Sequence, residues 1–496
     1  MASLTFRNPD RRRSARPSLL AAAALLAAGG CAVGPDFHRP VPPAVAGYTS
    51  DPLASAPGGP SLIAGQDIPA EWWRLFQSPA INSLVVQALK ANPDLEAARA
   101  ALRAAQQTYY AQRAAFLPSV EADYNVTRQR ASATPAPPLT SGNNLFTLHT
   151  AQVSVSYTLD VFGGVRRQTE QVAAETEQQK FETEAAYLTL TSNVVAAAVQ
   201  EASLRDQAAA TREIIRSDRD VLTLMRQQYK VGEIARADVA AQEAVVFQAE
   251  QTLPPLEKQL AQQRDLIADL TGRFPSEAPG ERVDLASLAL PQQLPVSLPS
   301  KLVDQRPDIR AAEANLHAAS AAVGVAVANR LPSFTLTANA GGASTSLAQL
   351  FGDSNSFWGL AADVSQPVFE GGALYHRQKA AEAALDQAKA QYRSAVLAAF
   401  QNVADTLQAL QADQRQYDAA AAAETSAAES LAIAKRQLEL GQVSGVTVLT
   451  AEQADETARI ALIQAQANRY ADAAALFQAL GGGWWNRPSI EAANRE

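Results

Sequence analysis

The chain has 496 residues, of which 47% are hydrophobic and only 6% aromatic, and its formal net charge is −8. Alanine supplies much of the hydrophobic content, which favours close-packed helices over a core of large side chains. Residues 1–30 hold five arginines and one aspartate, so a chain that has lost them is still more acidic, which argues against nucleic acid as a partner.

The first thirty residues have the pattern of an export signal. Arginines precede an apolar run at 19–28, which is about half the ~20 residues that a membrane-spanning helix needs. Cys31, the only cysteine, follows three small residues, as at a bacterial lipoprotein cleavage site, and Ala32 after it indicates release to the outer membrane. We therefore expect a covalent lipid on Cys31 and no other cofactor. The alternative is an ordinary signal peptide followed by an incidental cysteine.

The rest of the chain reads as two copies of one unit. Residues 92–124 match 306–338 position by position, and each copy is expected to run helix, strand, strand, long helix, helix. The predicted organisation is a signal peptide at 1–30, an extended segment at 31–80, a first repeat at 81–272, a linker at 273–300, a second repeat at 301–481 and a C-terminal tail at 482–496.

Each repeat is predicted to contain one pair of strands. Apolar and polar residues alternate over about ten positions, the length of a tilted transmembrane strand with lipid on one face and water on the other. Four strands are fewer than the about eight of the smallest single-chain outer-membrane barrels, and open strand edges are not tolerated in lipid, so the pattern predicts an oligomer. The alternative is a soluble four-stranded sheet with one buried face. The expected strands are 119–128, 151–161, 334–340 and 358–368, with loops at 131–146 and 341–356.

A helix of unusual length follows each pair of strands. Neither proline nor glycine occurs from Val165 to Lys230 or from Ala373 to Leu440, which predicts helices on the order of 100 Å long. Apolar residues in the first of them have coiled-coil spacing, in which Thr211 and Asp218 are the weak steps. Each long helix is expected to end in a turn, from which a second helix returns to form a helical hairpin.

Glycines mark the expected changes of direction. Those between a strand and a long helix allow a sharp redirection that other residues resist, and those after the long helices are well placed to end them. The turns also carry charged residues, for which a solvated loop is the simpler interpretation. The strand-to-helix glycines are Gly163, Gly164, Gly371 and Gly372, and the turn residues are Gly232, Glu233, Arg236, Asp238, Gly441 and Val443.

Five dispersed motifs resemble the NodT-type, TolC-like outer-membrane efflux lipoproteins over essentially the whole mature chain. The resemblance implies a mainly α-helical protein with a β-barrel part. In it, three subunits with four strands each close a twelve-stranded barrel, which a long periplasmic α-helical barrel continues. The motifs are VGPDFHRP (33–40), YTLDVFGGVRR (157–167), LPPLEKQLAQQRDLIADLTG (253–272), RPDIRAAEANLHAA (306–319) and QPVFEGG (366–372).

The same resemblance implies a function and a set of partners. The protein would be the exit channel of a tripartite pump, located in the outer membrane, lipid-anchored and extending into the periplasm. A homotrimer would join a periplasmic adaptor protein and an inner-membrane proton-driven transporter to export drugs or other small toxic compounds. The turn residues named above would lie at the periplasmic tips, where the family has a closed iris that the adaptor opens.

Other classes of function fit the sequence less well. The four histidines are scattered and no HExxH, P-loop or GxSxG pattern appears, so we expect no enzyme. Met225 is the only methionine after the signal, so no path of soft ligands for a metal cargo is apparent. A lipid-tethered structural coiled coil would leave the alternating strands unexplained. A TolC-like channel for type I protein secretion stays open as an alternative.

Overall fold

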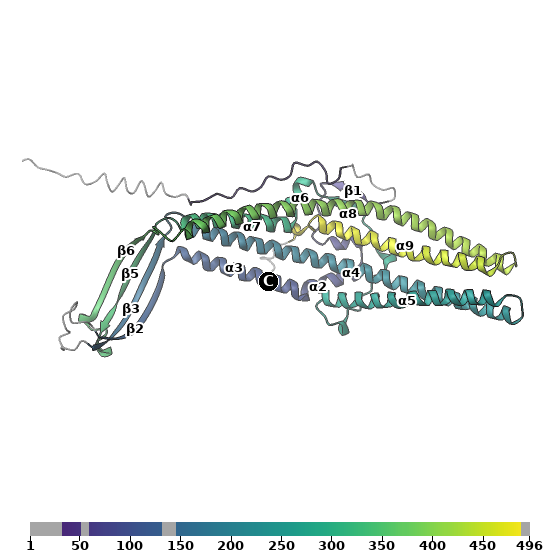
Figure 1. Ribbon diagram of the computed structural model, residues 1–496, viewed down its shortest axis with the longest axis horizontal. Coiled ribbons are helices and arrows are strands. Elements are labelled where there is room, and N and C mark those ends of the chain that lie inside the picture. Colours follow the sequence, from purple (N-terminus) through teal and green to yellow (C-terminus); the bar gives the residue numbers. More distant parts are fainter. Residues whose placement is uncertain (1–31, 51–58, 131–144, 488–496) are drawn as a thin grey trace, which may run out of the picture. The chain divides into compact units, whose positions relative to one another are not determined.

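The computed structural model describes residues 32–50, 59–130 and 145–487 (Figure 1). The predicted signal peptide and Cys31 lie outside these residues. The chain forms two compact units, to both of which α3 (Pro93–Arg113), α4 (Gly164–Lys230), α7 (Pro307–Ala328) and α8 (Ala373–Glu439) contribute. No helix within the described ranges combines the length and the apolar character needed to cross a membrane.

Both repeats have the predicted order of elements. Two short helices precede them, and two short strands pair in parallel. The first repeat has α3 (Pro93–Arg113), β2 (Ser119–Arg130), β3 (Leu145–Leu159), α4 (Gly164–Lys230) and α5 (Arg236–Leu270). The second has α7 (Pro307–Ala328), β5 (Ser333–Ser344), β6 (Ser356–Ser365), α8 (Ala373–Glu439) and α9 (Gly445–Ala479). The remaining elements are β1 (Ser61–Ala64), α2 (Pro79–Ala91), β4 (Gln293–Val296) and α6 (Pro299–Gln305).

The first unit is built around a four-stranded antiparallel sheet in the order β2-β3-β5-β6 (Figure 1). Three of the predicted strand boundaries were wrong in detail. Strand β3 begins at Leu145, inside the predicted loop, and β5 continues through Gly341 and Gly342, while β6 ends at Ser365 rather than 368. Composition suggested loops there, but cross-strand pairing extends the ladder, because Gly341 pairs with Gln152 and Gly342 with Ala151.

The register of the sheet places most of the apolar side chains of its four strands on one face. Val153 pairs with Ala122 on one side and with Ala340 on the other, and Ala340 pairs with Trp358. The opposite face carries mainly small and polar residues, and its large apolar side chains, Phe146, Leu148 and Phe357, lie toward the end of the sheet where β3 and β6 begin. Trp358 is 78% exposed on the apolar face, and β2 and β6 each pair on one side only among the described strands. The sheet thus has an apolar face and two open edges.

The second unit contains the main hydrophobic core. Trp72, Trp73 and Phe76, in a short 3₁₀ helix at 72–76, are fully buried, and Trp72 stacks on Phe477 of α9 with ring centroids 5.2 Å apart. Burial of such large aromatic side chains contributes several kcal/mol. The segment 31–80, predicted to be extended, therefore supplies part of a core.

The predicted linker at 273–300 also has structure of its own. It contains β4, which pairs with β1 from the N-terminal segment. It contributes the fully buried Leu294 and the largely buried Leu285 to the same core. The segments that precede the two repeats thus pack in one core. Their contact could not be predicted from the sequence, because the two segments are far apart along the chain.

Two helical hairpins complete the second unit (Figure 1). In the first, Leu222 and Met225 of α4 pack against Val239 and Val246 of α5. The second hairpin has a smaller cluster, in which Ala434 of α8 packs with residues of α9. Small residues let the helices approach closely, as the coiled-coil spacing predicts.

Candidate functional sites at the strand-to-helix junctions and hairpin turns

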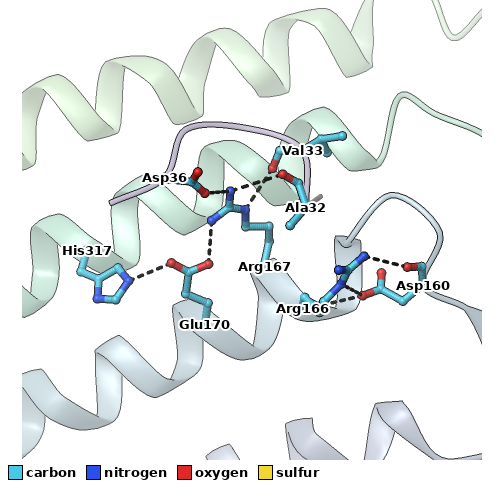
Figure 2. Close-up of polar contacts among 8 residues, drawn as sticks. All are labelled: Ala32, Val33, Asp36, Asp160, Arg166, Arg167, Glu170 and His317. Atoms are coloured by element: carbon cyan, nitrogen blue, oxygen red, sulfur yellow. Dashed lines mark hydrogen bonds and ion pairs between the residues drawn. The ribbon is translucent and has the colours of Figure 1, made fainter. Parts of the chain in front are cut away.

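Asp160 begins the first strand-to-helix junction, directly after β3 ends at Leu159. Its carboxylate accepts hydrogen bonds from the backbone N–H groups of Val165 (2.9 Å) and Arg166 (3.0 Å). It also accepts one from Arg166 Nε at 3.1 Å (Figure 2). A carboxylate in this place satisfies the free donors at the start of α4 and matches the helix dipole. Sequence reasoning missed this role, although an aspartate shortly before a long helix is a known capping signal.

The two glycines of the first junction have different roles. Gly163 has a φ of +77°, in the left-handed region, and a Cβ there would lie 2.5 Å from the Cα of Ala32. Gly164 is already the first residue of α4, and its Cβ position is 3.2 Å from the Ala328 side chain. Redirection therefore depends on Gly163, while Gly164 allows close approach of α7.

The second junction is longer and more open. The residues from 366 to 372 connect β6 to α8, and Gly371 and Gly372 both have positive φ, +61° and +86°. The side chains of Val368 and Phe369 here are about nine-tenths exposed. Both glycines thus have the backbone freedom that the sequence analysis predicted.

The N-terminal segment lies against the first junction and is held by Arg167 (Figure 2). The guanidinium is only 4% exposed and donates to the carbonyl oxygen of Val33 at 3.0 Å. It also binds the carboxylates of Asp36 (2.6 Å) and Glu170 (2.8 Å). Burial lowers the pKa of Arg167, but these two hydrogen bonds outweigh it, so its pKa lies above the ordinary value. The arginine stays charged.

Contacts on α7 extend this network. His317 Nε2 lies 2.8 Å from the second oxygen of Glu170 (Figure 2), and its ring stacks on Phe37 with centroids 4.3 Å apart. A Cβ on Gly34 would lie 2.4 Å from the Cα of Gly324, so the N-terminal segment crosses α7 at a point where both segments have a glycine. The VGPDF stretch of the sequence is thereby fixed in one path.

Each long helix ends at the glycine that the sequence analysis proposed. Gly232 has a φ of +81°, and the N–H of Glu233 donates to the carbonyl of Gln228 at 3.0 Å. The second turn repeats this geometry with Gly441 (φ +65°) and the N–H of Gln442. These are Schellman motifs, in which glycine takes a conformation unfavourable for other residues.

The charged turn residues are mostly engaged within their own hairpin. Asp238 accepts a hydrogen bond from the N–H of Ala235 at 3.0 Å, at the start of α5, and Arg236 forms an ion pair with Glu243 at 3.1 Å. Glu233 is exposed and Val443 is half-buried. As gate residues, all of these remain predictions.

Buried carboxyl groups lie further along the hairpins. The pKa of Asp218 is raised to about 6, mainly by burial and then by the charges of Glu452 and Glu456, while Lys435 lowers it. The described residues contain no group of three or more side chains suited to bind a metal ion. The raised pKa makes the Asp218 carboxyl a candidate for proton binding.

A second buried carboxyl lies within the second hairpin. The pKa of Asp413 is raised to about 7 by burial, a hydrogen bond to Asp472 and the charge of that residue, while Arg469 opposes the shift. Sequence reasoning missed both buried carboxyls as titrating groups, because charged residues on long helices are usually solvated.

Comparison with known proteins agrees with this architecture. The family model described as outer membrane efflux protein matches residues 84–273 and 298–482. The pyoverdine export outer membrane protein OpmQ of Pseudomonas putida is 31% identical over 86% of this chain and 91% of its own. The toluene efflux pump outer membrane protein TtgC of the same species is 30% identical over 92% and 94%.

Solved structures show the same fold. The outer-membrane channel OprN superposes with a TM-score of 0.83 at 26% identity, covering 92% of this chain and all of its own. The open-state Neisseria gonorrhoeae MtrE outer membrane channel gives 0.80 at 27% identity, covering 92% of this chain and 99% of its own. With both repeats matched and the long hairpins, the four-stranded sheet and the junctions in place, this chain belongs to the outer membrane efflux protein family, the TolC-like channels of the outer membrane.

Proposed function

We propose that three copies of this chain form the exit channel of a tripartite pump that exports small toxic compounds. The observation that supports the trimer best is the four-stranded sheet with one apolar face and two open edges. In lipid, each unpaired backbone group costs several kcal/mol, so β2 and β6 must pair with strands of other copies. Three copies supply twelve strands, enough to enclose a lumen lined by the polar face.

The cargo and the partners are argued from relatives. Toluene and pyoverdine stand in the names of two proteins that resemble this chain equally well, so similarity does not single out one compound. Small organic molecules are the cargo class common to both. We infer that a periplasmic adaptor and a proton-driven inner-membrane transporter choose the cargo and that this chain catalyses no reaction.

A lipid on Cys31 is the proposed anchor. Cys31 lies outside the described residues, but it is bonded to Ala32, and consecutive Cα atoms are about 3.8 Å apart. The backbone around Ala32 is held at the first junction, because the N–H of Val33 donates to the carbonyl of Phe162 at 3.1 Å. A lipid attached there would enter the membrane near the ends of the strands.

Dye accumulation in cells tests this function. We expect a deletion strain to retain more fluorescent efflux dye than its parent, with the difference abolished by a proton uncoupler. Equal accumulation together with loss of a protein from the culture medium would instead indicate type I secretion. Heat-modifiable trimers in detergent extracts test assembly separately, and a species that migrates as a monomer without heating would contradict the closed barrel.

A further inference from the structure

Helices α4 and α9 pack against each other along a line that joins the two hairpins, here called the α4–α9 seam. Gln207 Nε2 donates to Gln464 Oε1 at 3.1 Å, and Arg459 forms an ion pair with Glu213 at 2.7 Å. Nearer the turns, the Met225 methyl lies 3.7 Å from the Cβ position of Gly445. The pairs along the seam therefore follow in antiparallel order. Gln207 meets Gln464, Glu213 meets Arg459, and Met225 meets Gly445, while between them Asp218 lies within electrostatic range of Glu452 and Glu456.

The Asp218 step is the place where like charges meet in this seam. Asp218 is 2% exposed and Glu452 is 8% exposed. Among the described residues, neither Asp218 Oδ2 nor Glu452 Oε2 accepts a hydrogen bond. The nearby cation is Lys435 of α8, whose Nζ lies 3.1 Å from Glu452 Oε1. One ammonium therefore faces three carboxyl groups, counting Glu456, and buried charges without full compensation bind protons.

The duplicated sequence offers an internal reference for this arrangement. Lys435 stands six residues before Gly441 and Glu452 eleven after it, and Arg226 and Glu243 have the same spacing from Gly232 in the first hairpin. Arg226 and Glu243 form the equivalent ion pair at 2.9 Å.

The two equivalent glutamates differ in compensation. Glu243 binds a second cation, Arg236, and its side chain is 22% exposed. Gly445 occupies the position equivalent to Arg236, so Glu452 lacks that second cation. The hydrogen bonds of Arg226 and Arg236 hold the pKa of Glu243 below its usual range. The same position of the repeat is thus neutralised in one hairpin and left short of positive charge in the other.

We propose that the Asp218–Glu452 step retains a proton between the two hairpins, and that loss of this proton loosens the packing of α9 on α4. With the proton bound, the step carries one negative charge fewer and the seam closes. Without it, three carboxylates face one lysine and repel each other. Interpreting the loosened seam as a step in channel opening rests on the proposed function, whereas the loosening itself does not.

The direction with pH follows from the neighbours of Asp218. Glu452 and Glu456 of α9 raise its proton affinity, Lys435 of α8 lowers it, and from α5 the amide of Gln242 donates to its backbone carbonyl. The pKa of Asp218 is raised in the folded chain to about 6. Protonated Asp218 therefore stabilises the folded seam fully below pH 4, and this contribution is lost as the pH rises through about 6. The seam is therefore closed in acid and loosened at neutral and higher pH.

Hydrogen exchange of the full-length protein in lipid nanodiscs tests the proposal. Wild type and Asp218→Asn are compared at pH 5 and at pH 8, so the intrinsic pH effect on exchange cancels at each pH. We expect amides of α9 between 448 and 460 to exchange equally at pH 5, and on the order of tenfold faster in the wild type at pH 8. Asp220→Asn on the exposed side of α4, and Glu243→Gln at the equivalent position of the first hairpin, should both exchange like the wild type.

Equal exchange of wild type and Asp218→Asn at pH 8 overturns the proposal. So does an equal effect of Asp220→Asn, since the change would then reflect the charge of α4 in general. Conductance in planar bilayers is measured on the same samples. A pH-dependent seam in a protein that conducts nothing would contradict the proposed function alone, and a conducting protein with a pH-independent seam would contradict this inference alone.

Discussion

Replacing Arg167 with alanine should release the N-terminal segment from the first junction. Its hydrogen bond to the Val33 carbonyl joins a buried cation to a neutral acceptor, which contributes about 1.5–3 kcal/mol. The Asp36 pair adds less than about 1 kcal/mol, because that carboxylate is 78% exposed, and the Glu170 pair adds nothing to this hold, because it lies within α4. The expected loss is therefore about 2–3 kcal/mol in the free energy that holds the segment, or roughly 30- to 150-fold in its open population.

The amide of Val33 reports this opening directly, since it donates to the Phe162 carbonyl in the docked state. Hydrogen exchange at this amide, read in a peptide that begins before Val33, should rise by about one and a half to two orders of magnitude in Arg167→Ala. The neighbouring Arg166→Ala is the matched control, because Asp160 still accepts from the backbone amides of α4 without that side chain. Unchanged exchange in Arg167→Ala, or an equal rise in Arg166→Ala, would refute the assignment of Arg167 as the holding residue.

Three further predictions address the turns, a buried carboxyl and the sheet. Gly441→Ala should lower the apparent unfolding temperature, because a left-handed alanine costs about 1–2 kcal/mol although the site has open space. Gly280→Ala, equally open but without positive φ, should leave that temperature unchanged, and similar effects of the two would contradict this explanation. The pKa of Asp413 is raised to about 7, so protonated Asp413 stabilises the folded chain in acid, and this stabilisation is lost as the pH rises through 7. The unfolding temperature of Asp413→Asn should therefore depend less on pH between about 5 and 8 than that of the wild type. An unaltered pH profile would count against this explanation. Leu360→Arg, on the apolar face, should reduce trimers in the outer membrane at a cost of about 2–4 kcal/mol, whereas Ala361→Arg on the polar face should assemble, as gel migration without heating would show.

Local patterns in the sequence predicted most of the fold. The absence of proline and glycine identified both long helices to within a residue, and alternation of apolar and polar residues identified the strands. Both signals could be read from the sequence because they depend on neighbouring residues. The ends of the strands were less certain, since Gly341 and Gly342 have loop composition and are kept in the ladder by their partners on β3. Pairing partners are distant in sequence, so composition alone cannot supply them.

The sites depended on long-range contacts and were predicted only in part. Gly232 and Gly441 end their helices as expected, because a Schellman turn is a local motif. Arg167 was not recognised, because its partners Val33 and Asp36 are more than a hundred residues away. Asp218 was noticed as a weak step in the coiled-coil spacing, but the sequence does not show that α9 brings two more carboxyls to it. The local pattern shows that Asp218 is irregular, but its role depends on the carboxyl groups of the neighbouring helix.

The two open edges of the sheet have a consequence for genetics. A subunit that cannot satisfy its own strands is functional only together with its neighbours, so one defective copy damages the whole assembly. If trimers form at random from equal amounts of normal and defective subunits, only about one in eight contains no defective copy. Substitutions that spare edge pairing but block the pore should therefore be dominant, whereas substitutions that destroy the edges exclude the subunit from trimers and should be recessive.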